Sequence, residues 1–310
     1  MLLSTKYISF QAEQSSEISG ANILCLGNFD GVHYAHRTLL RTAKKLQSEK
    51  LTNAKCGVFC FEKPSTDYLS TQPQRHLTTL DQKLKYFADE GMDFAIIVDF
   101  PEIKDLSPEA FVNEVLIGQF ACVATVCGYN YHFGKKGAGT HQLLETLLPV
   151  GCAVTVPPVY QNGDTVSSTR IRRLLDVGNI QQANDLLTVP FSLTAPVEHG
   201  KGLGRQLCAP TFNQHPPLEM LIPPHGVYLT RCNIDGKYFY GLTNIGTRPT
   251  VDTNDTLNLE THLLDFEGDL YQRNLTVEFL DYIRPEIRFE STKELQAQIQ
   301  QDIKSAKERL

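Results

Sequence analysis

Apolar residues in the first half of the chain fall in short runs that alternate with helical patterns. Five runs read as buried strands: Ile23–Leu26, Lys55–Phe61, Asp93–Val98, Ala121–Val126 and Val154–Val156. Leu80–Ala88 has helical spacing, and Ser107-Pro108-Glu109 predicts the start of a helix that runs to about Gly118. Alternating strands and helices predict an α/β domain with a mostly parallel sheet, whose ligands bind beyond the carboxyl ends of the strands.

The pattern changes after about residue 188, where short β-branched and aromatic runs replace the helices. Asp235-Gly236 lies between two such runs and predicts a hairpin turn. Leu257–Leu264 and Leu275–Ile283 are further strand candidates, so we expect a small antiparallel β-barrel. Ser291 and Glu294 predict a capping box for a last helix, whose apolar stripe consists of Leu295, Ile299, Ile303, Ala306 and Leu310. The predicted domains are residues 1–187 and 188–310, with Thr188–Phe191 as the linker.

Composition narrows the class of protein. The chain has 310 residues, enough for two cores, and its net charge of −6 argues against nucleic acid as a partner. No apolar run approaches the length of a membrane span. Eight cysteines include no Cys-x-x-Cys pair, which predicts free thiols, no zinc and a cytoplasmic location. Whether the chain forms a homo-oligomer stays open.

The run from Leu24 to Leu40 combines a buried strand, a glycine turn and a helix start. His33 and His36 lie three residues apart at that start, so both rings can point the same way. Helix starts favour phosphate, and two neutral donors there could stabilise charge on a leaving pyrophosphate. We expect Arg37 and Arg41 on the solvent side of the helix.

Two more segments of the first domain follow strands and carry polar groups. The glycine-rich loop Cys127–Gly139 contains Gly128, Asn130 and Phe133. The segment Val166–Arg172 offers hydroxyl groups for a helix start, with an arginine that could reach a phosphate.

The second domain has its own candidates. His199–Arg205 is a glycine-rich phosphate-loop candidate. Pro210–Asn213 and Asn244–Thr250 follow it, and Glu260 lies on a predicted strand.

Together these motifs resemble the prokaryotic bifunctional riboflavin kinase/FMN adenylyltransferase (FAD synthetase) family. The first run is similar to its Gly-x-Phe-Asp-Gly-Val-His-x-x-His signature, and Ser167–Arg172 is similar to its Ser-Ser-Thr-x-Ile-Arg element. Pro210–Asn213 is similar to the Pro-Thr-Ala-Asn element of flavokinases. The resemblance implies a Rossmann-like nucleotidylyltransferase domain, then a riboflavin kinase barrel.

It further implies that riboflavin, FMN and ATP are substrates, that FAD is a product and that Mg²⁺ is required. Glu260, His33, His36 and Arg172 would be catalytic, and Thr211 and Asn213 would bind the metal. The implied ligand-binding residues in the first domain are Gly27, Asn28, Phe29, Asp30, Gly31, Gly128, Asn130, Phe133, Ser167, Ser168 and Thr169. Those in the second are Gly200, Lys201, Gly204, Arg205, Asn244, Gly246, Arg248 and Arg284.

The chain departs from the family pattern in several places. Ala35 replaces a glycine between the histidines, Asn130 replaces an aspartate, Gly137 replaces an arginine, and a Pro-His-Pro element is missing near Pro64. Three alternatives stay open: a riboflavin kinase with a degenerate first domain, a flavin-binding regulator without activity, and a nucleotidylyltransferase acting on another phosphate ester.

Overall fold

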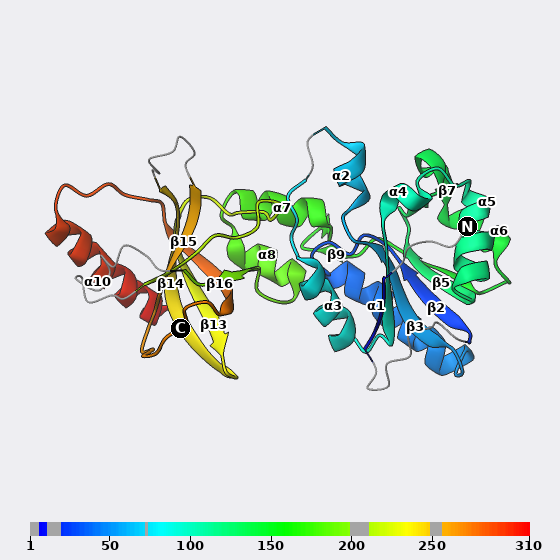
Figure 1. Ribbon diagram of the computed structural model, residues 1–310, viewed down its shortest axis with the longest axis horizontal. Helices are drawn as coiled ribbons and strands as arrows, with labels where there is room; N and C mark the ends of the chain where they lie inside the picture. Colours follow the sequence, from blue (N-terminus) through cyan, green and yellow to red (C-terminus); the bar gives the residue numbers. More distant parts are fainter. Residues whose placement is uncertain (1–5, 11–19, 72–73, 199–210, 249–255) are drawn as a thin grey trace. The chain divides into compact units, whose positions relative to one another are not determined.

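The computed structural model describes residues 6–10, 20–71, 74–198, 211–248 and 256–310 (Figure 1). Contacts along the chain divide it into two compact units, Met1–Ser168 and Thr169–Leu310.

The first unit is built on a six-stranded sheet in the order β1-β4-β3-β2-β5-β8. Its strands are β1 (Lys6–Ser9), β2 (Asn22–Leu26), β3 (Lys55–Phe61), β4 (Phe94–Val98), β5 (Cys122–Gly128) and β8 (Ala153–Val156). All neighbours pair in parallel except β1, which lies antiparallel on the edge beside β4. The predicted parallel sheet is confirmed. The sequence pattern missed β1, because this short edge strand is at most half-buried and contains no apolar run.

Helices cover both faces of this sheet. Ile23 and Cys25 of β2 pack towards α1 (Tyr34–Lys50) and α3 (Leu80–Asp89), whereas Leu24 and Leu26 face the opposite core. That second core contains the π-helix η1 (Phe111–Gln119) and α6 (His141–Leu147). A strand buried on both faces reads as an unbroken apolar run, which is why the pattern identified it.

The remaining short elements of this unit join the strands. They are α2 (Ser65–Leu69), α4 (Phe100–Ile103), α5 (Pro108–Ala110), β6 (His132–Phe133), η2 (Lys135–Gly137), β7 (Gly139–Thr140), β9 (Tyr160–Gln161) and β10 (Asp164–Thr165). The helix predicted to begin at Ser107 forms, with the Ser107 hydroxyl accepting the Ala110 N–H, and it continues as η1. The sequence pattern missed α2, which begins directly after Pro64.

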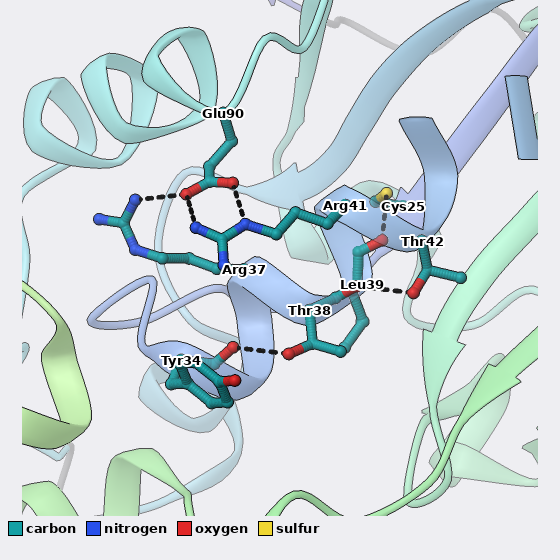
Figure 2. A network of polar contacts seen from close by, with 8 residues as sticks. All are labelled: Cys25, Tyr34, Arg37, Thr38, Leu39, Arg41, Thr42 and Glu90. Carbon is teal, nitrogen blue, oxygen red and sulfur yellow. Dashed lines mark hydrogen bonds and ion pairs between the residues drawn. The ribbon is translucent and has the colours of Figure 1, made fainter. Parts of the chain in front are cut away.

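The expectation that Arg37 faces solvent is wrong. Its side chain is only 8% exposed and donates to Glu90 at 2.7 Å, directly after α3 (Figure 2). Arg41 donates to the same carboxylate at 2.8 and 3.0 Å. Because Glu90 is itself buried, it draws the guanidinium of Arg37 inward, and this ion-pair cluster ties α1 to the end of α3.

The second unit contains the predicted antiparallel barrel. Its strands are β11 (Ser192–Pro196), β12 (Phe212–Gln214), β13 (Gly226–Ile234), β14 (Lys237–Arg248), β15 (Thr256–Leu263) and β16 (Asn274–Arg284), in the order β11-β16-β13-β14-β15-β12. A bridge between Glu198 and Asn213, and a bond from Gln214 to the Ala195 carbonyl, bring the two end strands together. The predicted hairpin turn is confirmed: Asp235 and Gly236 both have positive φ, as a type I′ turn requires.

The last helix, α10 (Thr292–Glu308), forms as predicted but differs at both ends. Ser291 caps it by accepting the Glu294 N–H, while the Glu294 carboxylate accepts the N–H of Glu290 instead of that of Ser291. Only half of the predicted capping box is therefore present. In the predicted apolar stripe Ala306 is fully buried, but Leu310 is 58% exposed because it lies beyond the end of the helix.

Helices α7 (Ser168–Asp176) and α8 (Ile180–Leu187) separate the sheet of the first unit from the barrel in sequence. Asn184 of α8 donates to the Phe279 carbonyl at 2.8 Å and accepts the Phe191 N–H at 2.7 Å. These hydrogen bonds attach α8 to the barrel, and α8 belongs to the second unit. The predicted domain boundary after residue 187 stays a prediction.

We expect Asn184→Ala to lower the free energy of unfolding of the second unit by about 1–3 kcal/mol, because it leaves two buried backbone groups without a partner. Urea denaturation would measure the change. Gln181→Ala, on an exposed position of the same helix, is the matched control and should change stability little. Equal effects of the two variants would contradict the role of this bond pair.

Seven cysteines lie in the described ranges, and none of these seven forms a disulfide. Burial raises the pKa of Cys60 to about 11 and that of Cys232 to about 12, so both stay thiols at neutral pH. The free thiols predicted from the sequence are confirmed for these seven positions. Within the part of the chain that the structure describes, no helix has the length and hydropathy needed to cross a membrane.

Candidate functional site

The topology of the first unit brings two predicted loops to one edge. β2 lies between β3 and β5, so the strand order reverses there and the loops after β2 and β5 open on the same side. A cavity of about 300 Å³ lies at this edge. It is lined by Leu26, Gly27, Asn28, Asp30, His36, Leu39, Phe61, Ser65, Gly128, Asn130, Tyr131, His132 and Ser168. Seven residues predicted from three separate motifs therefore meet at one cavity.

The two histidines point the same way, as predicted. Their rings stack with centroids 3.7 Å apart and planes 15° apart. His33 Nδ1 accepts the His36 backbone N–H at 3.4 Å and so caps α1. In the neutral ring, this acceptor role leaves the proton on Nε2 of His33, where it can be donated.

His36 is held neutral. Burial lowers the pKa of its imidazole well below the usual 6.5, and the neighbouring His33 and Lys83 lower it further. The ring lines the cavity and contacts Phe29, with centroids 5.2 Å apart. A neutral imidazole offers a hydrogen-bond donor without a full charge.

This lowered pKa predicts a pH dependence of stability. Below about pH 6.5 an unfolded chain protonates His36, whereas the folded chain does so only at lower pH. The unfolded state then binds more protons, so the free energy of unfolding should fall as the pH drops from 6.5 towards the native pKa. Urea denaturation between pH 7.5 and 5 would measure this fall. His36→Asn should make it shallower, and an unchanged slope would contradict the assignment.

The loop after β2 is fixed by a segment that the sequence analysis did not identify. The Asp30 carboxylate accepts the N–H groups of Leu77 and Thr78 at 2.9 and 3.3 Å. The Gly31 N–H donates to the Thr78 hydroxyl at 2.9 Å, and the Ser168 hydroxyl donates to the Asp30 carbonyl at 2.8 Å. Asp30 thus anchors the turn, and no sequence signal pairs it with a position 47 residues away.

Some predicted residues support the cavity from behind. Phe29 is fully buried and packs edge-on against Phe87, and Phe133 stacks on Tyr131 in the core below the sheet. Neither phenylalanine, nor Gly31, is among the cavity-lining residues. Direct contact of these three with a ligand stays a prediction, as do the roles of Ser167, and of Thr169 and Arg172, which belong to the second unit by contact.

In the barrel, the predicted metal-binding and catalytic residues form one row across three strands. Asn213 of β12 and Asn244 of β14 both lie opposite Glu260 of β15. Residues directly opposite on antiparallel strands point to the same face of the sheet. The Thr211 hydroxyl donates to the Glu260 carboxylate at 2.7 Å, so four predicted residues come together.

The donors in this row suit a hard cation. A hydroxyl oxygen of Thr211 and an amide oxygen of Asn213 lie beside the Glu260 carboxylate, and the Asn213 oxygen also accepts from Asn258 at 3.1 Å. Among the described residues, no three or more His, Cys, Asp or Glu side chains are grouped so that they could hold a metal ion. Mg²⁺ needs no such group, because it commonly keeps waters and binds substrate phosphates.

Glu286 is a neighbour of this row that the sequence did not single out. It accepts from the Asn244 side-chain amide at 3.3 Å. A Cβ atom at Gly246 would lie 2.3 Å from its carboxylate, so any larger residue there would require the Glu286 side chain to move. The predicted residues Asn244 and Gly246 thus share a neighbour from the segment after β16.

The other predicted residues of the barrel divide into two groups. Arg284 forms an ion pair with the buried Asp302 of α10, at 2.8 Å, which gives its guanidinium a structural partner; a role towards flavin stays a prediction. Gly200, Lys201, Gly204, Arg205 and the side chain of Arg248 lie outside the described residues.

Comparisons with known proteins match both halves of the chain. The FAD synthetase family model matches residues 15–170, and the flavokinase model, described as riboflavin kinase, matches residues 187–310. The bifunctional riboflavin kinase/FMN adenylyltransferase of Escherichia coli K12 is 36% identical over 293 residues, 92% of each chain. The protein of that name from Bacillus subtilis is 31% identical and covers 98% of this chain and 97% of its own.

A solved structure described as a macrolide-efflux protein from Streptococcus pneumoniae superposes with a TM-score of 0.83 at 25% identity. It covers 96% of this chain and 97% of its own, so the two folds agree over nearly their whole length. The word efflux describes that protein and is not applied to this chain. From the two family matches and the identities above 30% over most of its length, the chain belongs to the bifunctional riboflavin kinase/FMN adenylyltransferase family.

Proposed function

We propose that this chain carries out two consecutive steps of flavin cofactor synthesis. The barrel transfers the γ-phosphate of ATP to riboflavin, giving FMN and ADP. The α/β unit joins FMN to the AMP part of a second ATP, giving FAD and pyrophosphate. The observation that carries the proposal is that each unit gathers its own predicted polar residues. In one unit His36, stacked on His33, lines a cavity, and in the other Glu260 lies in a row with Asn213 and Asn244.

In the kinase step, Glu260 is the catalytic base. Its carboxylate orients the terminal ribityl hydroxyl of riboflavin and takes the proton as the γ-phosphorus is attacked. The Thr211 hydroxyl, which donates to Glu260 at 2.7 Å, fixes the direction of the carboxylate. The oxygens of Thr211 and Asn213 would hold Mg²⁺, which would supply positive charge to the phosphates.

In the adenylyltransferase step, an FMN phosphate oxygen attacks the α-phosphorus of ATP, and the bond to pyrophosphate breaks. No covalent enzyme intermediate is needed, so catalysis consists of positioning and charge stabilisation. His33 and His36 donate to the phosphates from the start of α1. The family resemblance assigns a further catalytic role to Arg172. Gly27, Asn28, Gly128 and Asn130 line the space for the nucleotide and the flavin phosphate.

The proposal includes Mg²⁺ as the metal, the cytoplasm as the place of action, and small molecules as the partners. The seven unpaired cysteines of the described ranges suit a reducing compartment.

Incubation with riboflavin, ATP and Mg²⁺, followed by chromatography over time, tests the proposal. FMN should rise first, and FAD should follow. FMN without FAD at every enzyme concentration would instead identify a riboflavin kinase with an inactive first unit. Binding of flavin without any product would identify a non-enzymatic flavin-binding protein.

A further inference from the structure

Lys83 is an unusual residue in the first unit. It lies on α3 between Leu80 and Phe87, on the apolar face of the helix, and is only 2% exposed. Lysine is almost never fully buried unless a carboxylate pairs with it. Within the described ranges, the ammonium of Lys83 forms no ion pair, and it donates to the Asn28 carbonyl at 3.2 Å.

Three neutral groups from separate parts of the chain lie near this ammonium. The Asn28 carbonyl belongs to the cavity loop, His36 to α1 and Cys60 to β3. His36 and Cys60 both sense its charge, and both are uncharged at neutral pH. Asp30, the nearest carboxylate of the loop in sequence, accepts the N–H groups of Leu77 and Thr78. A buried cation without a counter-ion is costly to the free protein.

Lys83 also completes an attachment between two segments. Leu77 and Thr78 hold the Asp30 end of the loop, and Lys83 holds the Asn28 end. The capping box of Thr79 and Gln82 fixes the start of α3 between these two points. Asn28, which accepts from the ammonium, and His36, whose pKa the ammonium lowers, both line the cavity.

We propose that Lys83 is a positioning residue of the adenylyltransferase site, whose buried charge lies behind the Asn28 loop and attracts a bound polyphosphate into the cavity. The inference rests on the proposed function of the first unit. The bound polyphosphate then serves as the counter-ion that Lys83 lacks in the free chain. Binding of this anion offsets the free-energy cost of the buried charge. The ammonium acts through the loop and the field in the cavity and takes no part in proton transfer.

Two substitutions separate charge from hydrogen bonding. Lys83→Met removes both the charge and the donor, whereas Lys83→Gln keeps an N–H donor for Asn28 without the charge. Lys85→Met is the matched control, because Lys85 is a 74% exposed lysine of the same helix that pairs with Asp89. Affinity for inorganic pyrophosphate with Mg²⁺, measured by titration calorimetry on the full chain, is the first readout.

We expect both Lys83 variants to bind pyrophosphate about ten-fold more weakly than the wild type and the Lys85 control. In FAD synthesis from FMN, KM for ATP should rise more than kcat falls, and riboflavin phosphorylation should be unchanged. The urea midpoint of Lys83→Met should not fall, since the variant removes an uncompensated buried charge. A purely structural lysine would give the opposite: a lower midpoint and unchanged pyrophosphate affinity.

Unchanged pyrophosphate binding in Lys83→Met, or wild-type binding in Lys83→Gln, would overturn the role of the charge. If Lys83→Met does not fold, Lys83→Gln alone decides by the same binding measurement. Failure of the proposed function is distinguishable, because the wild type would then make no FAD, whereas failure of this inference leaves wild-type FAD synthesis intact.

Discussion

Glu260→Gln is expected to reduce FMN formation from riboflavin by about 10²–10⁴-fold, the contribution typical of a positioned general base. The amide keeps the shape of the carboxylate but cannot take the proton of the attacking hydroxyl. Its oxygen can still accept from Thr211, so the row of Asn213, residue 260 and Asn244 should stay assembled. The rate would be measured with riboflavin, ATP and Mg²⁺.

The same variant provides an internal control. With FMN supplied directly, Glu260→Gln should still make FAD at the wild-type rate, because the α/β unit has its own site. Glu219→Gln, an exposed carboxylate of the second unit, should leave both rates unchanged. Normal phosphorylation of riboflavin by Glu260→Gln would remove Glu260 from the mechanism.

Replacing either histidine of the stacked pair should have the second large effect. We expect His33→Ala and His36→Ala each to lower kcat for FAD synthesis by about 10²–10³-fold, the loss typical of one donor to a transition-state oxyanion. His33→Ala should cost more stability, because His33 also caps α1. The measurement is pyrophosphate release with FMN and ATP as substrates.

Because the rings are stacked at 3.7 Å, the two substitutions should not be additive. The double variant should lose much less than the product of the two single effects. His141→Asn, at the start of α6, is the control in the same unit, and riboflavin phosphorylation should be normal in all of these variants. Wild-type FAD synthesis by both single variants would rule out the histidine pair as the catalytic group.

Much of the fold could be predicted because periodicity reports burial directly. β2 is buried on both faces and α3 is amphipathic, and each left a clear pattern in the sequence. The edge strand β1 and the short α2 did not, because neither buries a continuous apolar face. Arg37 was misplaced for a related reason: its burial depends on Glu90, 53 residues away, and no local pattern contains that pairing.

In the candidate site, too, the residues with a local sequence signal were predicted, and those that depend on distant partners were not. The motifs identified His36, Asn28 and Ser168, because the segments that contain them resemble elements of a known family. All three residues line one cavity. The partners that position the motifs were missed. Thr78 supports Asp30 through backbone contacts, and Glu286 meets Asn244 only after the barrel forms. Lys83 left one usable signal, a charged residue on the apolar face of a predicted helix.

The central claim is that the first unit is an active adenylyltransferase despite Ala35, Asn130 and Gly137. The most direct test supplies purified FMN, ATP and Mg²⁺ to the full chain and follows FAD and pyrophosphate together. We expect both products in a one-to-one ratio, and we expect both to be lost in His36→Ala. Rapid conversion of riboflavin to FMN by the same preparation, with no FAD at any enzyme concentration, would contradict it.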